Sequence, residues 1–361
     1  MSVNICPSPD LGSLTDLLLK ALADAGLKAS LRSADRADWL DASARVDYLP
    51  VDYSGAMIDY QLEYWSGNSQ PTTDISLTLM HNYRPSALWP LSATIDSNGK
   101  WRIGSNGGAM LPPLFVSGMA RKSTKSIVEG SLAFLRSVCE SIGQDRIHGA
   151  EAYSDALGLS EWHERMMHAG AIPELRHDLF LDVSRPMTDI WTSFRKSCKT
   201  RIASGDKLWR VQIVRTADPG QWDEFRLLHH AVAGRATRSD ESWRLQHDAI
   251  ASGDAFFVCL RDDVGRMVGG GLFHVTPSEG LYAVAAYDRA LFDKPLGHVV
   301  QFHAIQEMKR RGVRWYKLGA CVYPTDTPSP SEKEMSISHF KQGFASHLFP
   351  RYLTRYELKP S

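Results

Sequence analysis

Hydrophobic and polar positions in the first half of the chain follow two different spacings. Leu14, Leu18 and Leu22 recur at helical intervals, which predicts an amphipathic helix that stops at Gly26. Apolar and polar side chains instead alternate over residues 74–80, which predicts a half-buried strand. Similar patterns predict strands at 88–91 and 101–103, joined by a turn at 98–99, and a helix at 123–142.

The second half of the chain shows a helix, a strand, two helices and then three consecutive strands. The first helix is expected from about 188 to 203, as one continuous element with apolar residues on one face. A long helix after Pro295 ends in a basic turn at Arg310-Arg311 followed by Gly312. The other expected elements are strands at 209–213, 255–260, 267–275, 281–287, 313–318 and 352–358, and helices starting at 218, 242 and 333.

Length and composition limit the possible classes of protein. A chain of 361 residues predicts two domains, and its hydrophobic and charged contents are those of a globular protein. Five cysteines without a Cys-x-x-Cys pair predict structural thiols and no metal site. The amino-terminal residues do not resemble a secretory signal, and no apolar stretch approaches the ~20 residues of a membrane span, so a cytoplasmic protein is expected.

Charge is unevenly distributed although the net charge is zero. Residues 1–100 hold 12 acidic and 7 basic side chains, whereas residues 195–215 hold 7 basic and 1 acidic. Arg195 and Lys199 are spaced to share a face of the expected helix, and Arg201 lies close by. Such a cluster is compatible with a phosphate backbone as partner, although charged helix faces more often only meet water.

A lysine between two aromatic residues is the main candidate for chemistry. Lys341 lies in the segment Phe340-Lys-Gln-Gly-Phe344, directly after a proline-containing loop. A desolvated cation suits acyl transfer, because negative charge develops on the carbonyl oxygen in the transition state. The alternative is a surface lysine whose stem packs on its aromatic neighbours.

The order of these elements resembles the GNAT acyltransferase fold, and the second half resembles the FemAB/FemX-like aminoacyltransferases. These tandem-GNAT proteins move an amino acid from aminoacyl-tRNA onto an amine, usually of a cell-wall precursor. Four segments carry the resemblance: 179–197 with its basic Ser-Phe-Arg-Lys-Ser, the central strand 281–288, the strand 312–319, and the closing Phe-Lys-x-x-Phe motif at 340–344.

The resemblance implies an α/β (α+β) fold of two GNAT-like domains in tandem, with mixed central sheets flanked by helices. Residues 1–170 would form the acceptor-side domain and 171–345 the catalytic domain, while 346–361 would form a terminal strand that packs back on the first. It also implies that Lys341 stabilises the oxyanion beside Phe340. Tyr287 and Asp288, at the end of the central strand, are candidates to relay the proton lost by the amine.

The donor and the acceptor remain open at this stage. Aminoacyl-tRNA is the expected donor, with no cofactor and no metal, and a small amine or a cell-envelope precursor is the expected acceptor. An acyl-CoA-dependent N-acetyltransferase is the alternative, because Gly297 lies where that branch holds pyrophosphate, although Val299 replaces a second small residue. A non-catalytic binding protein of the same fold is the second alternative. Arg235 and Arg238 are further candidates to bind a phosphate or carboxylate.

Overall fold

The computed structural model describes residues 11–68, 70–151 and 160–358, and these form two compact units. Unit 1 contains the described residues of Met1–Tyr48, Gln61–Leu175 and Tyr352–Ser361, and unit 2 contains Leu49–Tyr60 and Arg176–Arg351. Cys6 lies outside the described residues, and the other four cysteines are buried free thiols. None of the helices in the described ranges has the length and apolar character needed to cross a membrane.

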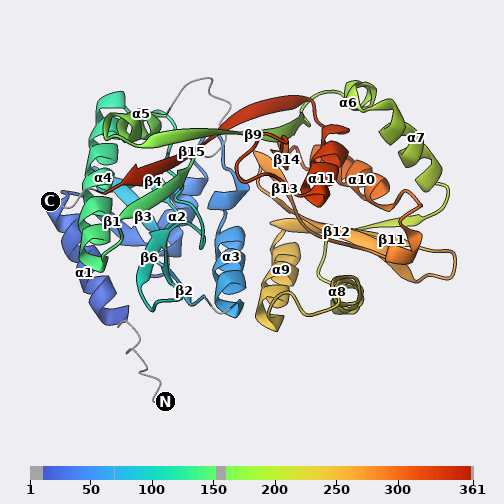
Figure 1. The fold of residues 1–361 in the computed structure, drawn as a ribbon, viewed down its shortest axis with the longest axis horizontal. Helices are drawn as coiled ribbons and strands as arrows, with labels where there is room; N and C mark the ends of the chain where they lie inside the picture. The colour runs from blue at the N-terminus through green and yellow to red at the C-terminus, as the bar shows by residue number, and fades with distance from the viewer. Residues whose placement is uncertain (1–10, 69, 152–159, 359–361) are drawn as a thin grey trace, which may run out of the picture. The chain divides into compact units, whose positions relative to one another are not determined.

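Unit 1 packs its helices on a four-stranded antiparallel sheet, β1-β3-β4-β7, and it also contains a three-stranded sheet, β2-β5-β6 (Figure 1). Side chains of α1, α4 and both sheets share one core that includes Leu14, Leu79 and Leu135. The elements are α1 (Leu11–Asp24), β1 (Lys28–Leu31), α2 (Arg36–Ser43), β2 (Thr72–Asp74), β3 (Leu77–His81), β4 (Arg84–Trp89), β5 (Ser92–Ile95), β6 (Trp101–Gly104), β7 (Leu114–Phe115), α4 (Arg121–Ile142), β8 (Arg146–Ala150) and α5 (Glu161–His168).

The hairpin of unit 1 differs from the expected one. The turn at Asn98-Gly99 joins β6 to β5, with Ile95 opposite Trp101, rather than to the expected strand at 88–91. Pro90 has no N–H to continue a ladder of hydrogen bonds, and β4 ends just before it, at Trp89. The prediction of a strand through 88–91 was therefore wrong at its second half.

Unit 2 has a central sheet with helices on both faces (Figure 1). Its strands lie in the order β10-β11-β12-β13-β14-β9. One face packs against α6, α7, α10 and α11, and the other packs against α8 and α9. The elements are η1 (Val51–Tyr53), α3 (Gly55–Gly67), β9 (Ile172–Asp182), α6 (Met187–Ser193), α7 (Lys196–Gly205), β10 (Arg210–Val214), α8 (Pro219–Ala233), α9 (Asp240–Ser252), β11 (Ala255–Arg261), β12 (Met267–Val275), β13 (Glu279–Tyr287), η2 (Arg289–Leu291), α10 (Leu296–Arg310), β14 (Trp315–Cys321), α11 (Glu332–Gln342) and β15 (His347–Glu357). Of these, α3, β9 and β15 continue into unit 1.

The basic helix expected at 188–203 is two helices. α6 ends at Ser193, and both Phe194 and Arg195 have extended ψ angles, of 144° and 140°, before α7 begins. Phe194 is buried, and its ring packs 5.2 Å from that of Phe344. This tertiary contact accompanies the break, and Arg195 becomes the N-cap of α7 instead of an interior helical residue.

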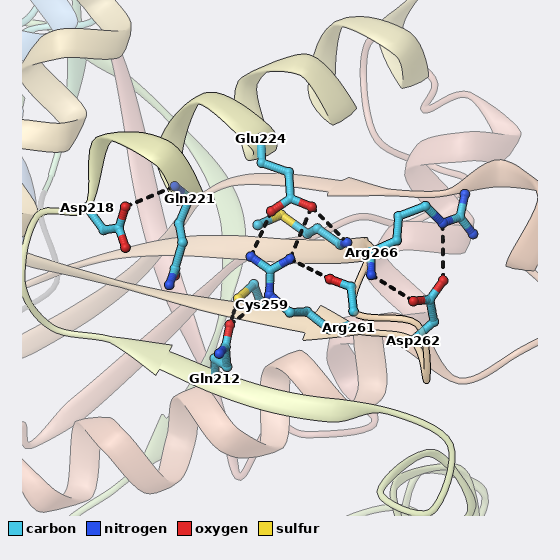
Figure 2. A network of polar contacts seen from close by, with 10 residues as sticks. Gln212, Asp218, Gln221, Glu224, Cys259, Arg261, Asp262 and Arg266 are labelled. Atoms are coloured by element: carbon cyan, nitrogen blue, oxygen red, sulfur yellow. Dashed lines mark hydrogen bonds and ion pairs between the residues drawn. The ribbon is translucent and has the colours of Figure 1, made fainter.

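Helix α8 is fixed to the sheet by a network of polar contacts (Figure 2). The guanidinium of Arg261, on β11, donates two hydrogen bonds to the Glu224 carboxylate of α8, at 3.1 and 2.7 Å. Arg261 Nε also donates to Gln212 Oε1 of β10 at 2.9 Å, and the Met267 N–H of β12 donates to Glu224 at 2.9 Å. Bidentate charged pairs of this kind define orientation as well as energy, so α8 is held over three strands.

An early segment of the chain belongs to unit 2. The Val51 N–H donates to the buried Glu279 carboxylate at 3.1 Å, and Lys317 Nζ lies 3.1 Å from the carboxylate of Asp52. Burial opposes the charge of Lys317, but Asp52 and then Glu279 and Asp178 outweigh it and raise the lysine pKa above its usual value. Residues Leu49–Tyr60 therefore satisfy charges that β13 and β14 bury.

Candidate active site

The two central strands of unit 2 are paired over only part of their length. β13 and β14 are parallel, and their registered pairs run from Glu279 opposite Trp315 to Leu281 opposite Lys317. β13 continues to Tyr287 and β14 to Cys321 without further pairs between them. Ligands of α/β folds bind where the carboxyl ends of neighbouring strands separate, which makes this end of the sheet the candidate site.

Lys341 lies beside this separation. It is in the last turn of α11, which begins with a capping box between Ser331 and Glu334 and packs against β14. A Cβ built on Gly319 of β14 would lie 3.0 Å from Lys341 Nζ, and Gly319 has a φ of +100°, which side-chain-bearing residues rarely adopt. The glycine therefore allows the ammonium group to approach the strand backbone closely.

Lys341 is partly buried. Burial lowers the pKa of Lys341 below the usual lysine value, and the carboxylate of Asp178 on β9 offsets part of that effect. Within the described ranges, no ion pair within 4.0 Å involves Lys341. A partly desolvated cation of this kind can interact strongly with developing negative charge.

Phe340, Gly297 and Tyr287, all named from the sequence, come together at the first turn of α10. A Cβ built on Gly297, in the first turn of α10, would lie 3.4 Å from Phe340 Cζ and 3.6 Å from the Tyr287 hydroxyl. The Phe340 ring also packs 4.9 Å from the ring of His298. Phe340 thus covers the start of α10 with an aromatic wall.

Tyr287 and Asp288 point to different partners. The Tyr287 hydroxyl lies 2.6 Å from that of Tyr282, and burial, followed by the nearby Tyr282, raises the Tyr287 pKa well above the usual value. The Asp288 carboxylate instead accepts from the Ala290 N–H at 3.0 Å and pairs with Arg266 at 3.2 Å. Tyr287 points toward the first turn of α10, whereas Asp288 caps η2 at the end of the strand.

The basic residues of α7 have distinct contacts. The Arg195 guanidinium lies 2.7 Å from His339 Nε2, and the Arg195 backbone N–H donates to the Gly343 carbonyl at 3.0 Å, so Arg195 joins α7 to both sides of Phe340. Lys199 Nζ donates to the Thr192 carbonyl at 3.2 Å. Arg201 is exposed, and its charge contributes to lowering the pKa of His298 on α10.

Arg235 and Arg238 do not join this group of residues. Arg235 is exposed, directly after the Gly234 C-cap of α8. Arg238 donates to Gln246 Oε1 at 3.1 Å and stacks on Trp243, with 4.8 Å between its guanidinium carbon and the ring centroid. Both side chains therefore belong to the α8–α9 face of unit 2.

Sequence analysis missed three residues near the site. His298 adjoins Gly297, and burial and then the charge of Arg201 lower its pKa to about 4. Gln301, one turn further along α10, accepts from the Tyr316 hydroxyl at 2.5 Å, and it also bonds Tyr282. Asp178 is a buried carboxylate whose charge acts to raise the pKa of both Lys317 and Lys341. Only the position of His298 directly after Gly297 could have indicated any of them.

Comparison with known proteins defines the class. Residues 192–327 match the family model described as an acetyltransferase (GNAT) domain. The fold is similar to that in a crystal structure of FemX, with a TM-score of 0.62 and 11% identity over 86% of this chain and 96% of FemX. A search of curated proteins by sequence finds no match.

Two further solved structures share the fold. L-PGS from Bacillus licheniformis has a TM-score of 0.53 and 12% identity, covering 99% of this chain and 95% of that one. A tandem GNAT protein from the clavulanic acid biosynthesis pathway has a TM-score of 0.50 and 14% identity, covering 93% of this chain and 99% of that one. These likenesses confirm the expected FemX-like tandem GNAT fold, and residues 192–327 match an acetyltransferase (GNAT) domain.

Proposed function

We propose that this protein transfers an aminoacyl group from aminoacyl-tRNA to an amine and forms an amide. The amine nitrogen attacks the ester carbonyl, the new C–N bond forms, and the C–O bond to the tRNA ribose breaks. The amine loses one proton, and the released ribose hydroxyl gains one. Lys341 carries the proposal, because a desolvated cation beside Gly319 at the separating strands is suited to stabilise the oxyanion.

Proton transfer is assigned to Tyr287 before Asp288. The raised pKa of Tyr287 keeps the phenol protonated, so Tyr287 would accept the amine proton only as its own hydroxyl proton passes to the released ribose oxygen. Its hydrogen bond to Tyr282 holds the hydroxyl in place. Asp288 already bonds Arg266 and the Ala290 N–H, and it would act through an intervening water.

The basic residues of α7 support a tRNA donor. α7 packs against α10, where a Cβ on Gly205 would lie 2.3 Å from Val299 Cγ2. Arg195, Lys199 and Arg201 are thereby placed beside the helix whose first turn Phe340 covers. Several cations along one surface suit a polyanion, and the loss of counterions from tRNA would add to the affinity.

Acyl-CoA is the second candidate donor. The first turn of α10 has no side-chain cap, since its N-cap is Pro295, and a helix start with free N–H groups favours phosphate. Against this, Phe340 lies against Gly297, and Val299 is fully buried under α7. We therefore expect no high-affinity binding of acetyl-CoA.

The deciding experiment compares donors under single-turnover conditions. The full chain is mixed with labelled aminoacyl-tRNA or with labelled acetyl-CoA, together with a panel of primary amines that includes cell-envelope precursors. The proposal expects amide product from aminoacyl-tRNA, lost in Lys341→Met and kept in Lys333→Met, an exposed lysine of the same helix. Product from acetyl-CoA alone, with micromolar affinity by calorimetry, would establish the alternative.

A further inference from the structure

A second group of polar side chains lies on the α8–α9 face of unit 2, away from Lys341. The Trp243 cluster is defined here as His229, His230, Arg238, Trp243, Gln246 and His274. The rings of His229 and His230 lie 5.2 and 6.0 Å from that of Trp243. The Arg238 guanidinium stacks on the same ring and donates to Gln246.

His274 places this cluster relative to the candidate active site. It lies on β12, opposite Leu281 of β13, which is the last residue of β13 paired with β14. His274 is 1% exposed, and its ring lies 6.2 Å from that of Tyr60 on α3. The Tyr60 hydroxyl also accepts a hydrogen bond from Arg238 at 3.3 Å, so Tyr60 joins His274 to the rest of the cluster at the row where β13 and β14 begin to separate.

Several polar atoms of the cluster are buried without a hydrogen-bond partner in the described part of the chain. They are His229 Nδ1, His230 Nε2, Trp243 Nε1, Gln246 Nε2 and both ring nitrogens of His274. Gln246 and Trp243 are themselves 0% and 2% exposed. Nearly all buried polar groups in proteins are hydrogen-bonded, because leaving one without a partner is unfavourable. Their concentration in one place is typical of a binding site, where a ligand supplies the partners.

The chemistry of the cluster favours an anion. Trp243 Nε1 and Gln246 Nε2 can only donate, Arg238 is a cation, and none of the six side chains is a carboxylate. Burial, and then the charges of Arg238 and His230, lower the pKa of His229 to about 4, and burial alone lowers that of His274 to about 4. Each neutral histidine still has one N–H to donate.

We propose that the Trp243 cluster binds an oxyanion, a carboxylate or a phosphate, carried by the amine acceptor. The inference rests on the proposed function for its assignment to the acceptor. Gln246 and Trp243 donate hydrogen bonds to the oxyanion, and Arg238 balances its charge. His274, on strand β12, donates a further hydrogen bond that orients it. The acceptor amine is then directed from the α8–α9 face toward the separation between β13 and β14.

Calorimetry on the full chain tests this directly, with inorganic phosphate and N-acetylglycine as probes and without any donor. Each titration is run in two buffers of different ionisation enthalpy at mildly acidic pH. A bound anion stabilises charged histidine, so binding should take up protons as the pKa of His229 rises from about 4. Saturable binding of either probe with proton uptake is expected, and the preferred probe tells a carboxylate from a phosphate acceptor.

Two variants and one control locate the site. Gln246→Glu replaces a donor by a negative charge and should weaken binding about tenfold or more, the usual effect of losing a hydrogen bond to a charged group. His274→Phe keeps the ring contact with Tyr60 and should weaken binding severalfold without lowering the melting temperature. Arg244→Gln removes an exposed cation of α9 outside the cluster and should bind normally.

The outcomes separate the inference from the proposed function. Absence of saturable binding, or wild-type affinity in a folded Gln246→Glu or His274→Phe, overturns the inference, even if aminoacyl transfer proceeds. Oxyanion binding that depends on the cluster upholds it, and a failure of transfer from aminoacyl-tRNA in the same preparation then counts only against the donor assignment.

Discussion

Replacement of Lys341 by methionine separates catalysis from stability at this site. Methionine keeps most of the stem that packs beside Phe340 and removes the ammonium group near Gly319. Loss of one preorganised oxyanion donor typically costs about 10²–10³ in rate, which is about 2.7–4 kcal/mol of transition-state stabilisation. The affinity for aminoacyl-tRNA should change much less, because the interaction strengthens only as the oxyanion forms.

The structure also predicts the sign of the effect on folding. The pKa of Lys341 is lower in the folded chain than in the unfolded chain, because burial disfavours the charged form. The charge therefore costs stability at pH values below the folded pKa, and this cost disappears as pH rises past the unfolded value. At neutral pH, Lys341→Met should melt at the wild-type temperature or above it.

A pH profile distinguishes a catalytic cation from a packed lysine. In the wild type, single-turnover transfer should fall at alkaline pH as Lys341 loses its proton, with the midpoint below the usual lysine pKa of 10.5. Lys341→Met should lose this limb, and Lys341→Arg should restore little activity, because a planar fork does not replace a point charge. A folded Lys341→Met that transfers at the wild-type rate would refute the assignment, and Lys333→Met is the matched control.

Three further changes test the surrounding structure. Arg195→Gln with Lys199→Gln should weaken tRNA binding and reduce the slope of log affinity against log salt by up to about two; an unchanged slope would show that α7 does not contact tRNA. Gly319→Ala should lower transfer strongly and the melting temperature modestly, since its Cβ would lie 3.0 Å from Lys341 Nζ at a φ of +100°; normal transfer would show that the ammonium position is not critical. Glu307→Gln should destabilise the protein above pH about 4.5 but progressively less in acid. Burial raises the pKa of the Glu307 carboxyl, but hydrogen bonds from three arginines outweigh burial and lower the pKa in the folded state, so the wild type loses this contribution as pH falls. Equal urea midpoints for the two proteins at neutral pH would contradict this. The three arginines that contact Glu307 are Arg215, Arg310 and Arg311.

The sequence was sufficient for elements whose own pattern determines them. The helix over Glu332–Gln342 was expected within two residues, and the structure shows that its start is set locally, by a capping box of Ser331 and Glu334. The break before α7 could not be predicted, since it coincides with the burial of Phe194 against Phe344, far away in the chain. Local patterns indicate where a helix is favourable, but distant packing decides whether it continues.

The candidate site was predictable residue by residue but not as an arrangement. Lys341 and Phe340 were named from one motif, whereas the approach of Lys341 to Gly319 depends on how α11 packs on β14. Arg238 was named as a possible anion contact, yet its neighbours Gln246 and His274 carried no signal in the sequence. A buried amide or imidazole without a partner becomes visible only when the surrounding elements are in place.

The contribution of Leu49–Tyr60 to unit 2 has a consequence for how this protein is made and dissected. Synthesis proceeds from the amino terminus, so Asp52 leaves the ribosome long before Glu279 and Lys317, and residues 61–175 of unit 1 are synthesised in between. A fragment cut at Arg176 would carry a buried lysine without Asp52 and a buried glutamate without the Val51 N–H. Loss of these partners should destabilise the excised second unit, and supplying or fusing the 49–60 peptide should restore its stability.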